Sequence, residues 1–487
     1  MAHRARDYLF YSATRALCGT CLRVVDAKEL IEGDRVWLWK RCPEHGIQRV
    51  LLSDDAAYFR RGREVFLKPP EQVARYNTPH EHGCPYDCGI CPDHEQHGCV
   101  SILEITDHCN LRCPTCYASS GPERLAHRPL DVIERMLDRI VANETEPDVL
   151  QVSGGEPTTH PDFFAVLDAC RRRPVRHLML NTNGIRIAKE DGFAERLASY
   201  APRFEVYLQL DSLRRSAHLD LRGADLRAIR ERALEKLDAL NLSTTLVCTV
   251  KRGVNDDELG DLLRFASQHR AVRGVTFQPV QDAGRNETFD PGEHRLTLSE
   301  VRRRITEQCD LFAPEDLLPV PCHPECLAMA YGIKSEDGTR ITPLTRYVDP
   351  RVLLDAGRNT IVYEGDRDLT RAIFSTFSTA HGPESAAGSL HDLLCCLPRV
   401  EALPSLGYDR VFRVIIMQFL DRHSMDLRSV RKSCVHIAHP DGTRVMPFDT
   451  YNVLYRDHLE AEVLAPLRAA VGGQGVPSAR KHALRTV

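Results

Sequence analysis

The stretch SILEITDHCNLRCPTCYASS, residues 101–120, joins a short apolar run to three closely spaced cysteines. SILEIT has the β-branched and apolar composition of a buried strand. Cys109, Cys113 and Cys116 follow it within eight residues. A tetrahedral zinc site or a four-iron cluster normally takes four protein ligands, so three thiols after a strand predict a metal centre with one position left open.

The region around this stretch alternates apolar runs with segments that carry apolar residues at helical spacing. Repeated strand–helix units predict a parallel sheet with helices packed outside, an open or closed α/β barrel. Strands are predicted at 101–106, 149–153, 177–182, 205–211, 244–250 and 274–280, and helices at 129–144, 162–173, 192–201, 225–240 and 257–269.

Polar clusters follow the predicted strands, where parallel α/β sheets bind their ligands. A glycine-rich cluster follows the second strand and polar side chains end the third, fourth and sixth. By contrast, Cys170 and Cys248 fall within a helix and a strand and are interpreted as small buried hydrophobic residues. The predicted ligand-binding positions are Gly154, Gly155, Glu156, Asn183, Gln209, Asp211 and Gln278.

Three thiols leave one iron of a four-iron cluster with an open coordination position. An amine and a carboxylate on one small molecule could chelate that iron, and S-adenosylmethionine carries both beside its sulfonium. An electron passed into the sulfonium would break a C–S bond and release a 5′-deoxyadenosyl radical. The cysteine triplet is therefore the predicted reaction centre.

The N-terminal segment carries a separate metal knuckle. Cys18 and Cys21 precede a predicted strand, VWLWK, and Cys42 and His45 follow it. This spacing predicts a zinc-ribbon or rubredoxin-like site for one Zn or Fe ion that stabilises a small module. The alternative for His45 is an ordinary surface histidine in a turn.

Two further cysteine groups predict auxiliary sites. Four thiols within sixteen residues of a Gly- and Pro-rich loop could fully ligate zinc or an iron–sulfur cluster, with unligated thiols as the alternative. In the C-terminal group the fourth ligand is Cys309, Asp449 or absent, with Cys309 preferred, and a zinc knuckle or free thiols are the alternative. The groups are Cys84, Cys88, Cys91 and Cys99, and Cys309, Cys322, Cys326 and Cys434; Cys395 and Cys396 are interpreted as structural or redox thiols.

Composition and charge describe an ordinary globular protein. The 487 residues are 43% hydrophobic and carry a net charge of −4, which predicts no nucleic-acid binding. Without a signal-peptide-like start or a long apolar run, a cytoplasmic location is expected. The expected parts are a metal domain (1–75), an iron–sulfur loop (76–100), a barrel (101–290), a C-terminal cluster and substrate domain (291–470) and a flexible tail (471–487).

Cys-x-x-x-Cys-x-x-Cys followed by Tyr117, placed after the first barrel strand, resembles the radical S-adenosylmethionine (SAM) superfamily over about residues 100–285. The resemblance implies a partial (β/α)6 radical SAM barrel. It also implies that Tyr117 flanks the adenine, that the cluster Gly154–Glu156 receives the methionyl amine, and that Gln209 and Asp211 lie near the ribose. Asn183 and Gln278 are further positions implied to bind the cofactor.

A closer resemblance, to the tetraether lipid synthase family, extends over most of the chain. It rests on CPEHG, GCPYDCGICPDH, LQLDSLRRSAHLDLRGADL, VKRGVNDDELG, GVTFQPVQDAGR, PVPCHPECLAMAY and CVHIAHPDGTRVMPFDTYNVLYR. The family includes proteins first described as methylating methanopterin. It implies a mononuclear metal, the SAM-binding 4Fe–4S cluster and one or two auxiliary clusters. The chain departs from the family at PFDTYN, where Asp449 stands in place of a cysteine.

The resemblance implies C–C bond formation on an unactivated carbon, with coupling of lipid tails as the main prediction. An apolar channel would then be lined by FSTFSTA, LGYDRVFRVIIMQFLDR or LVCTV. The alternatives are radical C-methylation of a pterin-like small molecule and a role as a peptide-modifying maturation protein. The expected partners are a reductant protein, ferredoxin or flavodoxin, and a lipid or small-molecule substrate, with peripheral membrane contact left open.

Overall fold

The computed structural model describes residues 6–67, 69–70, 75–287, 289–335, 337–346 and 410–472. Within these residues, no helix combines the length and the apolar character needed to cross a membrane. The segment FSTFSTA, Cys395 and Cys396 lie outside the described residues, as does the tail beyond residue 472.

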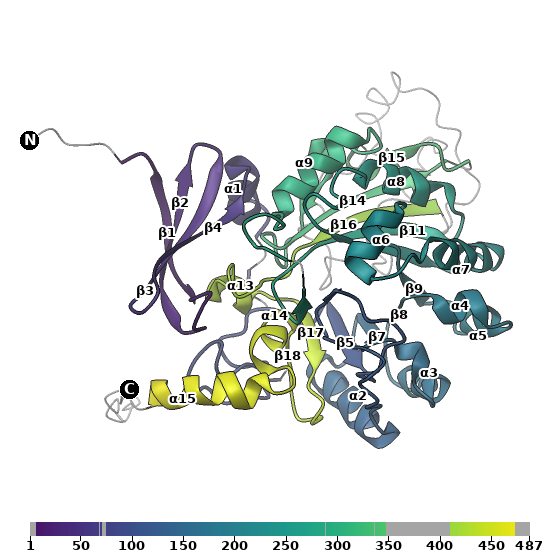
Figure 1. The fold of residues 1–487 in the computed structure, drawn as a ribbon, viewed down its shortest axis with the longest axis horizontal. Helices are drawn as coiled ribbons and strands as arrows, with labels where there is room; N and C mark the ends of the chain where they lie inside the picture. Colours follow the sequence, from purple (N-terminus) through teal and green to yellow (C-terminus); the bar gives the residue numbers. More distant parts are fainter. Residues whose placement is uncertain are drawn as a thin grey trace, which may run out of the picture.

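The N-terminal module is an antiparallel sheet that stands beside the rest of the protein (Figure 1). Its third strand contains the predicted VWLWK. Val36 and Leu38 on this strand are buried, and Val36 packs against the short helix α1. Trp37 and Trp39 alternate to the other face, where the Arg49 guanidinium lies 3.8 Å from the Trp37 ring centroid. The elements are β1 (Leu9–Leu17), β2 (Val24–Glu32), β3 (Arg35–Cys42), β4 (Gly46–Ser53) and α1 (Ala56–Glu64).

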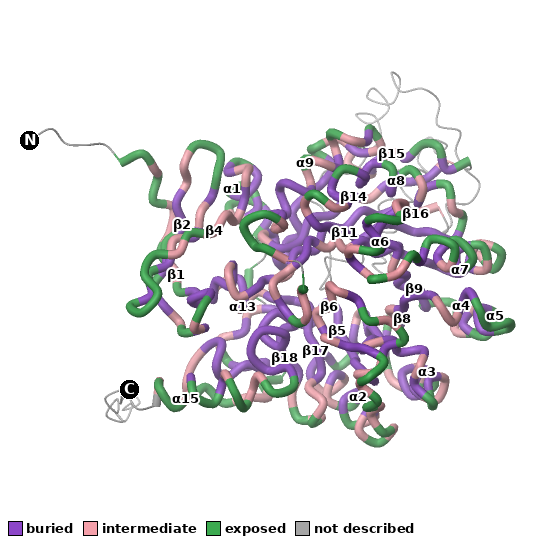
Figure 2. Tube along the Cα trace, viewed as in Figure 1, coloured by how far each residue is buried: buried purple, intermediate pink, exposed green. Residues whose placement is uncertain are grey.

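The predicted strand–helix repeat forms the parallel core of a 12-stranded sheet. Alternate strand residues face two different layers: one side packs against the helices and the other faces the barrel interior. In Figure 2 these strands are buried and the helices outside them are partly exposed. The strands are β5 (Val100–Glu104), β7 (Val149–Ser153), β8 (His177–Thr182), β9 (Phe204–Gln209), β10 (Thr244–Val250) and β11 (Val272–Pro279).

The predicted helices cover the outer face of this sheet. The apolar stripe of the first one buries Ile133, Met136, Leu137 and Ile140. The predicted helices correspond to α2 (Leu130–Glu144), α3 (Phe163–Arg171), α5 (Phe193–Ala198), α7 (Arg227–Ala239) and α8 (Leu259–Gln268). The sequence did not predict α4 (Ile185–Lys189), α6 (Arg215–Arg222), α9 (Leu298–Gln308) or the 3-10 helix η1 (Pro157–Thr159), which follows β7.

Strands of the C-terminal part extend this barrel on both edges. β16 (Val411–Met417) pairs in parallel with β11, and β17 (Val435–Ala438) pairs in parallel with β5. β14 (Leu327–Lys334) and β18 (Val445–Pro447) then add antiparallel strands outside them. The C-terminal part therefore shares its sheet with the barrel, because its apolar strands cover edges that the six-strand repeat leaves open.

The remaining elements connect these layers. Two π-helical turns and α15 run along the loop that carries the second cysteine group, where Tyr455, Thr450 and Arg468 contact that loop. The elements are β6 (Thr115–Cys116), β12 (Arg285–Asn286), η2 (Pro314–Asp316), β13 (Leu318–Pro319), β15 (Ile341–Pro343), η3 (Leu344–Arg346), α13 (Leu427–Arg431), α14 (Phe448–Thr450), η6 (Tyr451–Tyr455), η7 (Glu460–Leu464) and α15 (Ala465–Gly472).

Candidate metal centres and cofactor cavity

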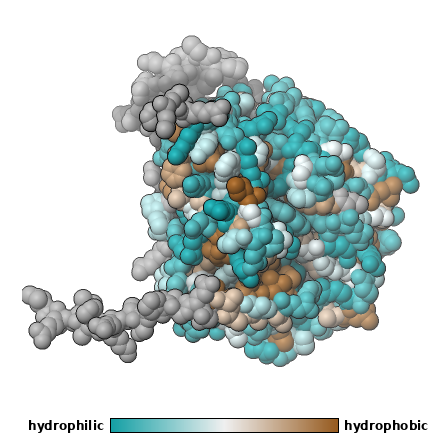
Figure 3. Space-filling model, turned by 60° about the vertical axis from the view of Figure 1, so that its left-hand side comes forward, coloured by the Kyte–Doolittle hydropathy of each residue, from teal (hydrophilic) through white to brown (hydrophobic). Residues whose placement is uncertain are grey.

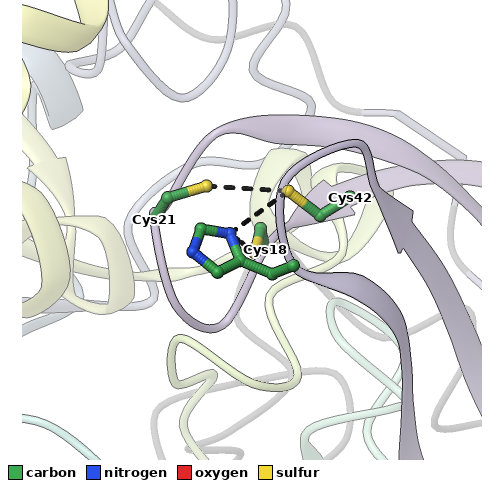
Figure 4. Close-up of side chains that lie close together, drawn as sticks. Cys18, Cys21 and Cys42 are labelled. Carbon is green, nitrogen blue, oxygen red and sulfur yellow. Dashed lines mark hydrogen bonds between the residues drawn. The ribbon is translucent and has the colours of Figure 1, made fainter.

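The N-terminal knuckle brings together all four of its predicted ligands. One donor atom from each of Cys18, Cys21, Cys42 and His45 lies within 4.8 Å of the others. The Cys21 and Cys42 sulfurs are 3.8 Å apart, and His45 Nδ1 is 3.4 Å from the Cys42 sulfur (Figure 4). Thiolates 2.3 Å from a tetrahedral ion are about 3.8 Å apart, so this spacing fits one zinc ion.

Backbone donors favour the charged form of one thiol in this knuckle. Burial raises the pKa of Cys18, but hydrogen bonds from the N–H groups of Cys21 and Thr20 and from the neighbouring thiols have the larger effect and lower it to about 6. The thiolate is the form of cysteine that binds metal, so a lowered pKa favours metal binding.

The cysteine triplet lies at the carboxyl end of β5, as predicted. Gly155 N donates to Thr106 O (2.8 Å) and Glu156 N donates to His108 O (2.8 Å), so the glycine-rich cluster after β7 runs directly against the loop that leads to Cys109. A Cβ on Gly154 would lie 2.4 Å from Thr106 O, and one on Gly155 2.2 Å from His108 O. The glycines are needed for this close approach, which fixes the start of the cysteine loop.

A loop after β11 holds the other side of the triplet. Arg285 donates through Nε to Cys113 O (2.7 Å) and through its Nη2 to Ser120 O (2.6 Å), and it pairs with Cys116 through β12 and β6. Gly284 has a φ of +66°, and a Cβ there would meet Tyr117 O at 2.3 Å. Arg285 and Gly284 lie in the quoted motif GVTFQPVQDAGR, which gave no sign of this role.

All three thiols open onto a cavity of about 190 Å³ inside the barrel. Burial raises the pKa values of Cys109 and Cys113, and the neighbouring thiols add to the effect. The sulfurs of Cys109, Cys113 and Cys116 do not all lie within 4.8 Å of one another, unlike the donor atoms of the N-terminal knuckle. Their spacing therefore fits an iron–sulfur cluster better than a single tetrahedral ion.

The ends of the neighbouring strands are joined by a chain of hydrogen bonds below the triplet. Arg222 donates to both carboxylate oxygens of Asp211, with Nε 2.7 Å from Oδ2, and also to Gln209 Oε1 (3.2 Å). Gln209 Nε2 donates to Asn181 Oδ1 (3.0 Å), and Asn181 Nδ2 donates to Ser153 Oγ (3.1 Å). Asp211 and Gln209 thus orient Arg222, a residue that the sequence prediction missed.

Two predicted ligand-binding side chains are already occupied by the protein. The buried Glu156 carboxylate accepts from Thr158 N (3.2 Å), Thr158 Oγ1 (2.6 Å), Thr182 Oγ1 (2.7 Å) and Asn183 N (2.7 Å). The Asn183 side chain donates to Asn110 Oδ1 (2.7 Å). These bonds tie the ends of β7 and β8 to the cysteine loop, so both residues shape the cavity wall.

Tyr117 and Gln278 both line the cavity, as predicted for cofactor-binding residues. The Tyr117 ring packs edge-on against Phe448, with centroids 5.1 Å apart, and Phe448 contacts Phe419 at 4.6 Å. Gln278 Nε2 donates to the Tyr207 hydroxyl (3.2 Å). The aromatic wall comes from the C-terminal part of the chain.

Arg230 is a buried cation that lines the cavity near the triplet. Within the described part of the chain, none of its three guanidinium nitrogens has a hydrogen-bond partner. Burial lowers its pKa to about 10, while Asp211 opposes this effect. A buried guanidinium without partners is costly, which suits it to receive an anionic group.

The auxiliary cysteines group differently from the prediction. Cys99, predicted as the fourth thiol of the second group, lies instead with Cys322 and Cys434, with the three sulfurs within 4.8 Å of one another. The reason is topological: Cys99 precedes β5 and Cys434 precedes β17, and these strands pair in parallel. The Cys322 and Cys434 sulfurs are 3.2 Å apart.

The other predicted members of the C-terminal group have different surroundings. Cys326 is buried beside this group, and its charge raises the pKa of Cys434. Cys309 instead ends α9 against Arg264 and packs into the helix-facing core, so the preference for it as fourth ligand receives no support. Asp449 accepts from Leu420 N (2.7 Å) and Ser433 Oγ (2.8 Å), and burial raises its pKa to about 6.

Cys84, Cys88 and Cys91 remain as a buried group in the loop before β5. Burial raises the pKa of each of these thiols, and for Cys84 and Cys88 a neighbouring thiol of the group raises it further. The Cys88 sulfur lies 2.9 Å from Thr450 Oγ1. Cys170 and Cys248 pack into the helix-facing core, as predicted for small hydrophobic residues.

Comparison with known proteins identifies two parts of the chain. Residues 103–266 match the family model of the radical SAM superfamily. Residues 10–54 match the HMPTM N-terminal zinc ribbon domain. The predictions of a radical SAM barrel, an N-terminal zinc ribbon and a radical SAM enzyme are confirmed.

Among curated proteins, this radical SAM enzyme is 29% identical over 491 residues to a 7,8-dihydro-6-hydroxymethylpterin dimethyltransferase from Methanocaldococcus jannaschii, a match that covers 93% of this chain and 96% of the relative. A GTP 3′,8-cyclase from Syntrophomonas wolfei is 29% identical over 230 residues, which are 46% of this chain and 68% of that protein. Among solved structures, Streptococcus suis SuiB bound to the precursor peptide SuiA is 17% identical at a TM-score of 0.36, covering 44% of this chain and 45% of that chain.

Proposed function

We propose that the chain is a radical SAM C-methyltransferase that acts on a pterin-like small molecule. The observation that carries this proposal is the length of the similarity to the pterin dimethyltransferase, which covers 93% of this chain. A match of this length extends on both sides of the radical SAM segment 103–266. The match therefore supports methyl transfer more strongly than tail coupling.

The residues at the barrel mouth fit a 4Fe–4S cluster with bound SAM. Three thiols, spaced too widely for one ion, meet the close-packed glycines and the unpaired Arg230 around one cavity. When bound, the cluster and SAM supply a primary carbon radical that can remove hydrogen from an unactivated carbon. The predicted ligands are Cys109, Cys113 and Cys116.

The chain's own side chains would position the cofactor. Arg230 presents an unpaired positive charge beside the triplet, and a methionyl carboxylate is an anion that would satisfy it, whereas Arg222 is already paired with Asp211. Tyr117 and Phe448 supply an apolar wall for the adenine. The buried walls keep bulk water from the reacting carbon.

The other thiol groups support one mononuclear and two auxiliary sites in our proposal. The zinc ribbon takes Cys18, Cys21, Cys42 and His45. Cys99, Cys322 and Cys434, with Cys326 beside them, form one auxiliary site, and Cys84, Cys88 and Cys91 form the other. A ferredoxin or flavodoxin is the proposed electron donor.

Coupling of lipid tails is the second candidate function, because the barrel interior has an apolar wall. Val100, Ile102, Val149, Met179 and Ile415 line the same cavity as the triplet. β16 belongs to the predicted channel segment LGYDRVFRVIIMQFLDR, whereas FSTFSTA lies outside the described residues. On the face shown in Figure 3, hydrophobic residues form small separate patches among hydrophilic ones, so this face offers no broad membrane-binding surface.

One assay separates the two functions. The anaerobically purified and reconstituted enzyme is reduced with SAM and given either 6-hydroxymethyl-7,8-dihydropterin or a dialkyl lipid. Methyl transfer predicts deoxyadenosine together with methylated pterin by mass spectrometry. Cross-linked tails with unchanged pterin would overturn methyl transfer in favour of coupling, and the absence of deoxyadenosine with every substrate would overturn both.

A further inference from the structure

Two polar side chains lie deep inside the barrel, below the cysteine triplet. Gln151 is in the middle of β7, opposite Ile102 of β5 and Met179 of β8. Thr276 is in β11, opposite Val247 of β10 and Ile415 of β16. Both side chains line the cavity and are 8% and 1% exposed.

The protein leaves both side chains with free hydrogen-bonding capacity. Within the described residues no hydrogen bond engages the Gln151 amide, which faces the cavity, and the Thr276 hydroxyl has only the Tyr207 hydroxyl beside it, which itself accepts from Gln278 Nε2. Polar groups on a cavity wall that lack a protein partner are the groups that fix the orientation of a bound ligand. The two residues therefore mark a place where a ligand completes the hydrogen bonding.

Other polar groups in the same interior are already paired. Below Gln151 and Thr276, Arg413 reaches across β11 and donates to the Glu205 carboxylate and to Thr245 Oγ1 (3.0 Å). A Cβ on Gly274 would lie 2.6 Å from Arg413 Cγ, so the glycine makes room for this crossing. Because Arg413 and Glu205 neutralise each other, the bottom of the cavity carries no net charge. This favours a ligand whose edge near Gln151 and Thr276 is uncharged.

We propose that Gln151 and Thr276 form a substrate subsite for the amide-type edge of a flat, uncharged nitrogen heterocycle. The proposal rests on the proposed function and specifies where its substrate binds. A glutamine amide offers an acceptor and donors side by side, which matches the acceptor and donor of a cyclic amide. Ile102, Met179 and Ile415 flank these groups and form apolar walls for the ring faces.

The subsite also determines which side of the bound heterocycle faces the cysteine triplet. Gln151 precedes Ser153 by two residues, and Thr276 precedes Gln278 by two, which is about 7 Å along each strand. Ser153 and Gln278 are at the level of the hydrogen-bond chain under the triplet. A heterocycle held at Gln151 by one edge thus points its opposite side toward the triplet, where hydrogen is removed.

An alkyl tail in this position would bind better to apolar side chains than to Gln151 and Thr276. It would leave Gln151 and Thr276 unpaired while gaining only apolar contacts, so replacing these side chains by apolar ones should strengthen tail binding. The same two substitutions therefore change the affinities for a heterocycle and for a tail in opposite directions.

The test measures binding of 6-hydroxymethyl-7,8-dihydropterin to the anaerobic holoenzyme by fluorescence titration. Gln151→Leu should weaken binding about 10- to 100-fold and Thr276→Val about tenfold. Thr244→Val is the matched control: it makes the same change on β10, where the Thr244 hydroxyl donates to Leu242 O outside the cavity, and should leave the affinity unchanged. Thermal unfolding checks that each variant is folded.

The outcomes separate the subsite from the function. If the wild type binds and methylates the pterin and both variants bind it as tightly, the subsite is wrong and the function stands. If the wild type does not methylate the pterin, and Gln151→Leu binds a dialkyl lipid more tightly, the proposed function and the heterocycle subsite are both overturned. Weaker pterin binding by both variants, with an unchanged Thr244→Val control, supports the subsite.

Discussion

The zinc ribbon and the Cys99 site are two thiol groups of the same protein with opposite architectures. The ribbon takes its donors from residues 18–45, at the ends of adjacent antiparallel strands. The Cys99 site takes its thiols from three segments, which include residues 335 positions apart in the chain (99 and 434). A local site is specified by spacing alone, whereas an assembled site exists only when distant strands pair.

The largest expected effect comes from breaking the assembled site. Cys434→Ala should lower the metal content, and because Cys434 immediately precedes β17 at the barrel edge, it should also lower the unfolding temperature of the whole protein. Cys42→Ala should remove zinc and leave the barrel folded. Metal analysis with calorimetry checks this, and equal effects of both substitutions on the barrel transition would contradict the comparison.

A smaller loss is expected from the ion pair that attaches β16 to the barrel. Arg413→Met leaves the Glu205 carboxylate buried without its main cation and should cost about 3–5 kcal/mol of unfolding free energy. The double variant Arg413→Met with Glu205→Gln should recover much of this loss, because no uncompensated charge remains. Denaturant titration of the single and double variants measures the coupling; strictly additive losses would argue against the pair.

Arg230 should behave in the opposite way in the protein without cofactor. Arg230→Met removes an unpaired buried charge, so the unfolding free energy should rise by about 1–3 kcal/mol. Binding of SAM should weaken about 10- to 100-fold, because the carboxylate loses a charged partner. Calorimetric titration and denaturant unfolding measure the two quantities, and unchanged SAM affinity would exclude Arg230 as its receptor.

The smallest expected effect concerns the loop of Cys84, Cys88 and Cys91, which depends on a distant tyrosine. The Tyr455 hydroxyl accepts from Cys88 N (2.7 Å) and lies 2.9 Å from Pro85 O and 2.8 Å from Tyr86 O. Tyr455→Phe should cost about 1–2 kcal/mol and increase hydrogen exchange in residues 83–91. Exchange in the zinc ribbon serves as the internal control and should not change.

The sequence predicted the features that depend on neighbouring residues. The six barrel strands appear within two residues of the predicted bounds, because alternation of side chains is a local pattern. The zinc ribbon ligands follow from spacing. The thiol regrouping and Arg222 depend on which segments meet, as does the engagement of Glu156 by Thr182 and Asn183, and spacing along the chain does not report that.

The position of β16 and β17 on opposite edges of the barrel imposes an order in time. During synthesis, the ribbon can bind its ion once the first fifty or so residues have emerged, whereas the barrel lacks both flanking strands until residues 411–438 are made. Until then Cys99 lacks Cys434, the thiol that the pairing of β17 with β5 brings beside it. On the proposed metal assignments, the Cys99 site would then be filled only after the zinc ribbon, once residues 411–438 have been made.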